Sequence, residues 1–162
     1  MKMQDINTER LVLREIEESD AQQLVKWRSD PEVYKYFTIP RKLTVEEHLN
    51  WYRNSYVSDA NRIDLIALER FKQNPVGVFG IKKKVGGTCV EISYLVDPQY
   101  QSRGYAREAM IALMFFAKEK WGCETAMAEI HKNNISSIEF AKRLDFSEIK
   151  IESDFVVMNK KL

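Results

Sequence analysis

The residues of this sequence with the clearest chemical potential lie in the stretch Leu95–Met110, where an expected strand ends and an expected helix begins. The first amides of a helix have no acceptor within the helix, and the helix dipole adds partial positive charge there. Gly104 lets an anion approach these amides closely, and two arginines flank the turn. This local chemistry suits a ligand that carries a diphosphate. The alternative is an ordinary turn, since Gln101-x-x-Gly104-x-Ala106 fixes only three positions.

Further candidates lie on the strand before this turn and on a later helix. The alternation in Cys89–Val96 places Glu91 and Ser93 on one face of a strand. Asn134 can cap a helix over about residues 135–144, because its side-chain oxygen can accept from a free amide of the first turn. The strand therefore offers a carboxylate and a hydroxyl, and the helix start offers an amide.

Composition places these residues in an ordinary globular protein. The 162 residues are 44% hydrophobic and 30% charged, so we expect one core and a single domain over residues 1–162. A net charge of +1 lacks the basic excess typical of nucleic-acid-binding proteins. We find no apolar run of membrane-spanning length, no signal peptide, and two cysteines far apart without metal-ligand spacing. We therefore expect a cytoplasmic protein with no metal, nucleic-acid or membrane partner.

The elements that must position the candidates follow a mixed α/β pattern around one sheet. Period-two alternation and turn signals predict strands at Arg10–Arg14, Ile63–Leu68, Val76–Lys84, Cys89–Val96, Thr125–Ile130, Ser147–Glu152 and Phe155–Met158. Capping boxes at Ser19–Gln22 and Thr44–Glu47 predict two helix starts, the first helix ending near Arg28. A third helix is expected from about Gly104 to Lys120, stopped by Gly122.

With the turn and the later helix in this order, the chain resembles the GNAT superfamily of acetyl-coenzyme A-dependent N-acetyltransferases. That family has Arg/Gln-x-x-Gly-x-Gly/Ala after its fourth strand, matched here by Gln101, Gly104 and Ala106. About thirty residues later it often has Asn-x-x-Ser and then Lys/Arg-x-Gly-Phe. The matching residues are Asn134, Ser137, Arg143 and Phe146, with Asp145 replacing the glycine. The opening Thr8–Arg14, with Asp20, resembles the ribosomal-protein N-terminal acetyltransferase branch.

The resemblance implies a single-domain fold with a mixed, mostly antiparallel sheet of about seven strands and about four helices, splayed between the fourth and fifth strands. Acetyl-CoA would lie in that opening as cosubstrate, its pantetheine pairing with strand backbone and its pyrophosphate on the turn. A backbone amide of the strand would stabilise the oxyanion. The cofactor contacts implied are Tyr94, Leu95, Val96, Gln101, Ser102, Arg103, Gly104, Tyr105, Ala106, Arg107, Asn134 and Arg143.

The resemblance leaves the acid and base less defined. Many relatives use a tyrosine as acid where this chain has Ala141, so Ser137 is the next candidate for a proton donor to the sulfur. The alternative for Ser137 is a capping role in its helix. Glu91 is the candidate base, because it lies on the face of Ser93, close to the expected thioester. Its alternative is a solvated or ion-paired carboxylate. His131 follows a strand and is a weaker candidate.

On the acceptor side we expect Tyr34, Phe37 and Ser93 to contact the substrate. The resemblance implies direct attack of a primary amine on the thioester in a ternary complex, and we expect a protein N-terminal α-amine. A small-molecule amine (antibiotic, polyamine or amino acid) is the alternative acceptor, and a non-catalytic acyl-CoA-binding regulatory module is the alternative function. The oligomeric state, monomer or homodimer, is left open.

Overall fold

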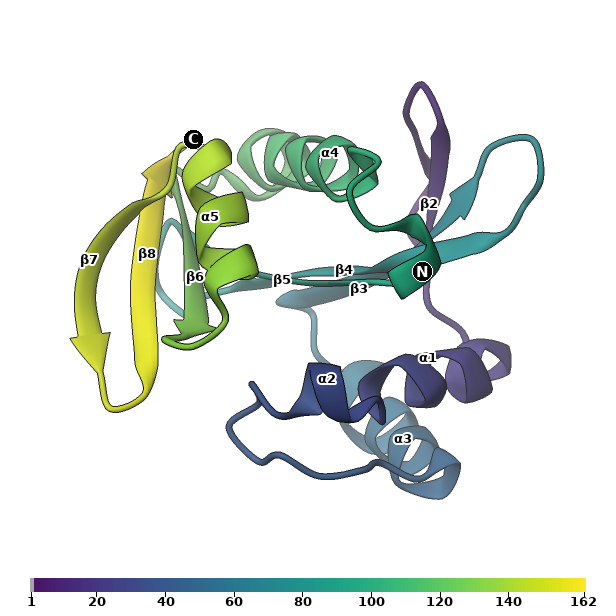
Figure 1. The fold of residues 1–162 in the computed structure, drawn as a ribbon. Helices are drawn as coiled ribbons and strands as arrows, with labels where there is room; N and C mark the ends of the chain where they lie inside the picture. The colour runs from purple at the N-terminus through teal and green to yellow at the C-terminus, as the bar shows by residue number, and fades with distance from the viewer. Residues whose placement is uncertain (1) are drawn as a thin grey trace.

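An eight-stranded sheet runs through the centre of the protein in the computed structural model, which describes residues 2–162 (Figure 1). The strands are ordered β1-β2-β3-β4-β5-β6-β8-β7. In chain order they are β1 (Ile6–Asn7), β2 (Leu11–Glu15), β3 (Arg62–Glu69), β4 (Pro75–Lys83), β5 (Cys89–Val96), β6 (Thr125–His131), β7 (Ser147–Glu152) and β8 (Phe155–Lys161). All neighbours are antiparallel except β5 and β6. The mixed, mostly antiparallel sheet is confirmed.

The parallel pair β5–β6 is where the sheet opens. Its register runs only from Cys89 opposite Thr125 to Glu91 opposite Met127. Beyond Glu91, β5 continues to Val96 without a partner on its β6 side, and in Figure 1 β6, β8 and β7 turn away from β3–β5. The predicted separation between the fourth and fifth long strands is therefore confirmed.

Helices cover the two faces of the sheet separately (Figure 1). One face carries α4 (Tyr105–Trp121) and α5 (Ile135–Arg143). The other carries α1 (Ala21–Arg28), α2 (Pro31–Tyr34) and α3 (Val45–Trp51), with a π-helical turn over Tyr52–Tyr56 after α3. We call these the α4–α5 face and the α1–α3 face.

Each face has its own hydrophobic cluster, because both sides of the central strands carry apolar residues. On the α4–α5 face, Met110 and Leu113 of α4 are fully buried together with Phe79 of β4. On the α1–α3 face a smaller cluster includes Trp27 and Ile66. Burying a side chain of this size contributes about 1.5–3 kcal/mol. The two clusters fix both helical layers to the same strands. Successive side chains along β3–β5 therefore point alternately toward one layer and the other.

The observed elements differ from the predicted ones mainly at their ends. Residues 2–162 form eight strands and five α-helices, where about seven and four were expected, because two-residue β1 and one-turn α2 are too short to show a period. The capping box expected at Ser19–Gln22 is wrong: the side chains of Glu17 and Asp20 make the reciprocal bonds instead. The box at Thr44–Glu47 is confirmed, with bonds of 2.8 and 3.1 Å.

Within this described part of the chain, no helix has both the length and the apolar character needed to span a bilayer.

Candidate active site

The open edge of β5 lies next to α5, and Tyr94 connects the two. Its ring packs against Phe140 with centroids 4.7 Å apart, and its hydroxyl donates to the carbonyl of Ser137 at 3.4 Å. Burial raises the pKa of Tyr94 to about 12, so the phenol stays protonated at neutral pH. Tyr94 and the first turn of α5 are therefore neighbours.

The turn from Gln101 to Gly104 leads from this edge into α4, and all four of its residues are exposed. Ser102 and Gly104 have positive φ angles of 61° and 81°. The first helical bond is from the Glu108 amide to the Gly104 carbonyl, at 3.1 Å. The amides of residues 105–107 therefore have no acceptor within the helix. Free amides at a helix start are the arrangement expected for an anion site.

Hydrogen bonds of Arg10 and Glu108, which the sequence did not predict, hold this turn in place. Glu108 accepts from the Thr8 hydroxyl at 2.6 Å and from the amide and Nε of Arg10, each at 2.7 Å. Arg10 also donates to the carbonyl of Arg103 at 2.8 Å and stacks over Tyr105 at 4.4 Å. Burial raises the pKa of Glu108, but these donors outweigh it and hold the pKa below its ordinary value. Thr8–Arg14 stood out as a motif, yet nothing in it indicated a partner about a hundred residues away.

The other arginines of the expected cofactor site lie around the same opening. Arg103 stacks over Tyr100 at 5.4 Å, and Arg107 donates to the carbonyl of Arg143 at 3.0 Å. This last bond joins the start of α4 to the end of α5. Asn134 lies at the opposite end of α5, where its side chain accepts from the Ser137 amide at 3.4 Å, so the predicted N-cap is confirmed.

The structure separates the two catalytic candidates. Ser137 lies in the first turn of α5 beside Tyr94, whose hydroxyl reaches the Ser137 carbonyl. Glu91 instead pairs with Lys84 across the β4–β5 hairpin at 2.6 Å. Ala141, at the position of the tyrosine acid in many relatives, is buried in the core. Ala141 therefore contributes to the packing of α5 against the sheet.

Near the expected acceptor residues Tyr34 and Phe37, the neighbouring Tyr36 reaches across to the splayed strands. The Tyr36 ring lies 5.7 Å from that of His131 at the end of β6, which in turn lies 5.4 Å from Phe155 of β8. The His131 Nδ1 accepts from the Asn133 amide at 3.1 Å. Tyr34 is half-buried and Phe37 exposed, and neither forms an aromatic pair within residues 2–162. Ser93 is exposed on the α1–α3 face of β5.

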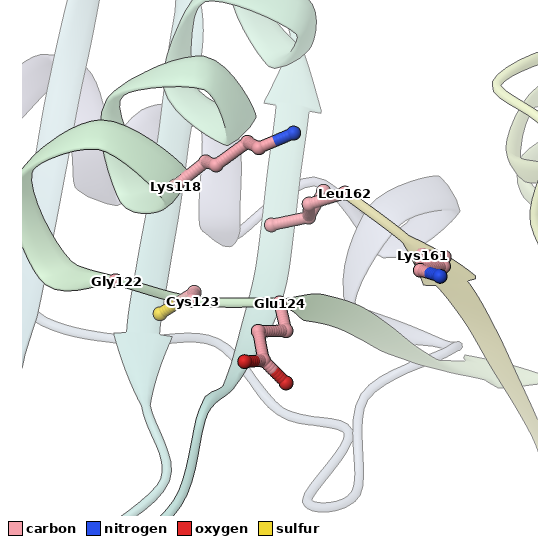
Figure 2. A pocket seen from close by; sticks show the side chains of 6 residues that line it. All are labelled: Lys118, Gly122, Cys123, Glu124, Lys161 and Leu162. Atoms are coloured by element: carbon pink, nitrogen blue, oxygen red, sulfur yellow. The ribbon is translucent and has the colours of Figure 1, made fainter.

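Two cavities of the described residues differ in their distance from these candidates. A cavity of about 500 Å³ lies at the far end of α4, lined by Lys118, Gly122, Cys123, Glu124, Lys161 and Leu162 (Figure 2). A smaller one of about 190 Å³ lies between α1 and the end of β5, where the Trp27 indole donates to Asp97 at 2.7 Å. The described residues contain no group of three or more His, Cys, Asp or Glu side chains able to hold a metal.

Comparison with protein families gives one match over most of the chain. The model of the acetyltransferase (GNAT) domain matches residues 10–147. The chain is 30% identical over 139 residues to the uncharacterized N-acetyltransferase YnaD of Bacillus subtilis, covering 86% of this chain and 80% of YnaD. It is also 30% identical over 150 residues to the uncharacterized protein MJ1062 of Methanocaldococcus jannaschii, covering 87% of this chain. The chain spans 29% of the length of MJ1062.

Solved structures give the same fold at lower identity. A Vibrio cholerae spermidine N-acetyltransferase, in complex with CoA and spermine, superposes with a TM-score of 0.84 at 14% identity, covering 95% of this chain and 96% of that one. A candidate ribosomal-protein-serine acetyltransferase from Vibrio cholerae superposes with a TM-score of 0.80 at 22% identity, covering 98% of both chains.

Proposed function

The chain belongs to the GNAT acetyltransferases and is an acetyl-CoA-dependent acyltransferase, and on this premise we propose that it acetylates a protein N-terminal α-amine. The observation that carries the proposal is the unpaired edge of β5 leading directly into the free amides at the start of α4. An extended ligand with a charged end fits this arrangement, since the strand edge offers backbone bonds and the turn offers amides.

The residues around this opening fit acetyl-CoA, which supplies an activated acetyl thioester. The backbone of Tyr94–Val96 would hold the pantetheine, and the amides after Gln101 would hold the pyrophosphate. A Cβ at Gly104 would lie 3.2 Å from the Arg10 guanidinium and would need a strained φ, so the approach to the turn depends on glycine. Arg103, Arg107 and Arg143 add positive charge, and Asn134 would bond the pantetheine through its side chain.

The remaining chemistry needs little from the protein. An α-amine has a pKa of about 7.7–8.0, so part of it is neutral at pH 7 and positioning supplies much of the rate. A backbone amide of β5 would stabilise the oxyanion, an effect worth about 3–4 kcal/mol. Ser137 is our proposed proton donor to the leaving thiolate, which its position beside Tyr94 on the open edge of β5 supports. Glu91 is our proposed base, although its ion pair with Lys84 also supports a structural role.

Two structural neighbours and the net charge bear on the choice of acceptor. The likeness to a candidate ribosomal-protein-serine acetyltransferase supports an N-terminal amine, and the likeness to a spermidine N-acetyltransferase supports a small polyamine. The net charge of +1 offers little attraction for a polycation, which favours the N-terminal amine. The alternative is a non-catalytic CoA-binding module. It is supported by Ala141, which stands where many relatives have a catalytic tyrosine.

Free thiol release tests the proposal directly. The protein is incubated with acetyl-CoA and a panel of peptides, polyamines and amino acids, and calorimetry measures acetyl-CoA binding in parallel. We expect binding and turnover with a peptide α-amine. Binding without turnover on any amine favours the non-catalytic module, and absence of binding contradicts the assignment of the opening.

Glu91→Gln tests the proposed base in the same assay. We expect kcat at pH 7 to fall by about 10²-fold, because the carboxylate no longer accepts a proton. Lys84→Met is the matched control, since it removes the ion pair but keeps the carboxylate. An unchanged pH–rate profile in Glu91→Gln removes this residue from the mechanism.

A further inference from the structure

Buried polar atoms without partners gather on the α1–α3 face. Across residues 2–162, four buried side-chain nitrogens lack a hydrogen-bond partner: Nε2 of Gln23, Nε of Arg28, and both ring nitrogens of His48. All belong to α1 or α3. Buried polar groups are normally bonded, and each exception costs about 1–3 kcal/mol. The clustering of the exceptions in one layer indicates a binding function there.

Arg28, the last residue of α1, is the most unusual member of this group. Among the described residues it forms neither an ion pair nor a hydrogen bond, and its Nε is shielded from solvent. Its charged neighbours are Asp64 and Arg62 of β3: burial lowers the pKa of Arg28, Asp64 opposes this, and Arg62 adds to it. Arg28 is half-buried and keeps its charge under such conditions, so its guanidinium carries a positive charge that no described residue pairs directly.

Asp64 links this guanidinium to the expected position of the thioester. Asp64, Gly80 and Ser93 lie opposite one another on β3, β4 and β5. A Cβ added at Gly80 would lie 2.3 Å from Asp64 Oδ1 and 2.7 Å from Ser93 Oγ, so both side chains lean over the glycine. Asp64 is 2% exposed and pairs with Arg62 at 2.9 Å, while Ser93 is exposed. Asp64 therefore lies beside the exposed Ser93, and its charge also acts on Arg28.

His48 lies in the same layer, 1% exposed and 5.4 Å from the ring of Trp51. The Arg62 guanidinium also stacks over the Trp51 ring, 4.9 Å from its centroid. Burial, and then the charge of Arg28, lowers the pKa of His48, so its ring is neutral at pH 7. A neutral ring offers one donor and one acceptor. A bound water can satisfy His48 or Gln23, but only an anion compensates the charge of Arg28.

We propose that this cluster recognises a carboxylate on the acceptor, Arg28 binding the carboxylate while Asp64 faces the amine beside Ser93. The inference rests on the proposed acetyl transfer and names its substrate class: an amine that carries a carboxylate nearby. Two sources share this chemistry, an acidic first residue of a peptide and a free amino acid. The cofactor phosphates do not account for Arg28, because their proposed partners lie around α4 and α5 on the opposite face.

Matched substrate pairs test the inference. A peptide beginning Asp-Ala is compared with one beginning Asn-Ala, and alanine with alaninamide. We expect wild-type kcat/KM to favour the carboxylate member of at least one pair by about tenfold or more. In Arg28→Met this preference disappears, through a KM about 10- to 100-fold higher for the carboxylate substrate, while the amide substrate and acetyl-CoA binding change little. The pair that shows the preference identifies the source.

Arg53→Met is the matched control, because Arg53 is exposed and paired with Glu18 at 2.7 Å, outside the cluster. It should leave the preference unchanged. Thermal unfolding adds a readout independent of activity: Arg28→Met should unfold at the same or a higher temperature, since it removes a half-buried charge that lacks a direct partner.

Three results overturn the inference. They are equal wild-type use of acid and amide, an Arg28→Met variant that keeps the preference, and a lower unfolding temperature for that variant, which indicates a structural arginine. With turnover on other amines intact, the first two leave the acetyl transfer standing. Turnover on no amine contradicts the proposed function and removes this inference with it.

Discussion

The two faces of the sheet present opposite kinds of unsatisfied polar group. On the α4–α5 side the free groups are backbone ones, the edge of β5 and the first amides of α4, and they flank the exposed turn Gln101–Gly104. On the α1–α3 face they are side-chain nitrogens of Arg28, His48 and Gln23, and these atoms are buried. Backbone groups suit a ligand whose chemistry never varies, such as the cofactor. Buried side chains suit a ligand that must be distinguished from similar molecules, such as the acceptor.

The contrast explains why one half of the site is easier to recognise in the sequence than the other. Backbone recognition needs a strand edge, a glycine and a helix start, and these leave a short contiguous motif. Recognition by buried side chains needs residues from several elements, here α1, α3, β3 and β5, that meet only in the folded protein. If the comparison is right, substitutions on one face should change cofactor binding and those on the other should change acceptor selection.

The largest expected effect follows from Gly104→Ala on the α4–α5 face. Its φ of 81° disfavours any side chain, and the new Cβ would lie 3.2 Å from the Arg10 guanidinium. We expect acetyl-CoA affinity, measured by calorimetry, to fall about 100-fold, or about 2.7 kcal/mol, since the turn must shift away from the pyrophosphate position. Acceptor preference should be unaltered.

Gly86→Ala is the control for this experiment. Gly86 has a similar φ of 72° in the β4–β5 hairpin, with nothing within 4 Å of an added Cβ. Both variants should lose about 1 kcal/mol of unfolding free energy, because both place a Cβ in the left-handed region. Equal acetyl-CoA affinities of the two variants would contradict a cofactor role for the turn.

The sequence predicts the first face well and the second poorly. The strand–turn–helix around Gly104 and the Asn134 cap follow from local residue types, and both are present. Asp145, where the family has glycine, still adopts a φ of 66°, so the backbone bend is kept. The Arg10–Glu108 ion pair joins residues 98 apart in the sequence. The environments of Arg28 and His48 depend on how α1 and α3 pack. No period or motif carries that information.

The acceptor side is tested next by Gly80→Ala. The added Cβ would collide with the ends of two side chains, Asp64 and Ser93, which can turn away. We expect the acceptor KM to rise about tenfold through their displacement, with acetyl-CoA affinity unchanged. Gly77→Ala is the contrast, because its Cβ would lie 2.3 Å from the Leu95 carbonyl, which is backbone and cannot rotate aside. That variant should lose stability as a whole, whereas an unchanged acceptor KM in Gly80→Ala would place Asp64 and Ser93 outside the acceptor site.

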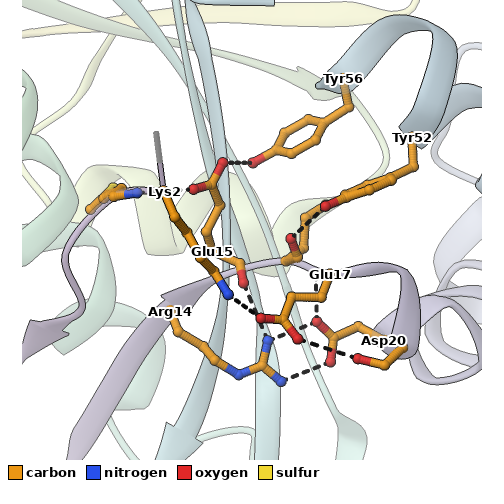
Figure 3. A network of polar contacts seen from close by, with 10 residues as sticks. Lys2, Arg14, Glu15, Glu17, Asp20, Tyr52 and Tyr56 are labelled. Atoms are coloured by element: carbon orange, nitrogen blue, oxygen red, sulfur yellow. Dashed lines mark hydrogen bonds and ion pairs between the residues drawn. The ribbon is translucent and has the colours of Figure 1, made fainter. Parts of the chain in front are cut away.

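The smallest effects come from two carboxylates that each hold one face. Asp20 binds Arg14 through two bonds of 2.8 Å and accepts from the Glu17 amide, within the polar network that leads to α1 (Figure 3). Burial raises the pKa of Asp20, but Arg14 and the Glu17 amide outweigh it and hold the pKa below its ordinary value. Its stabilising contribution is therefore complete above about pH 4, the pKa of an unfolded aspartate, and is lost as pH falls through the lower, folded-state pKa. Glu108 has the same sign on the other face.

Asp20→Asn and Glu108→Gln should each lower the unfolding free energy in urea by about 1 kcal/mol at pH 7. Each should also flatten the loss of stability below pH 4, because one acid-sensitive contact is gone. Their functional effects should separate by face: Asp20→Asn should raise the acceptor KM about threefold by loosening α1, and Glu108→Gln should weaken acetyl-CoA binding by a similar factor by releasing Arg10 from the turn. If both variants change the same parameter, the two faces do not bind different substrates, and the division of labour between backbone and side chains fails.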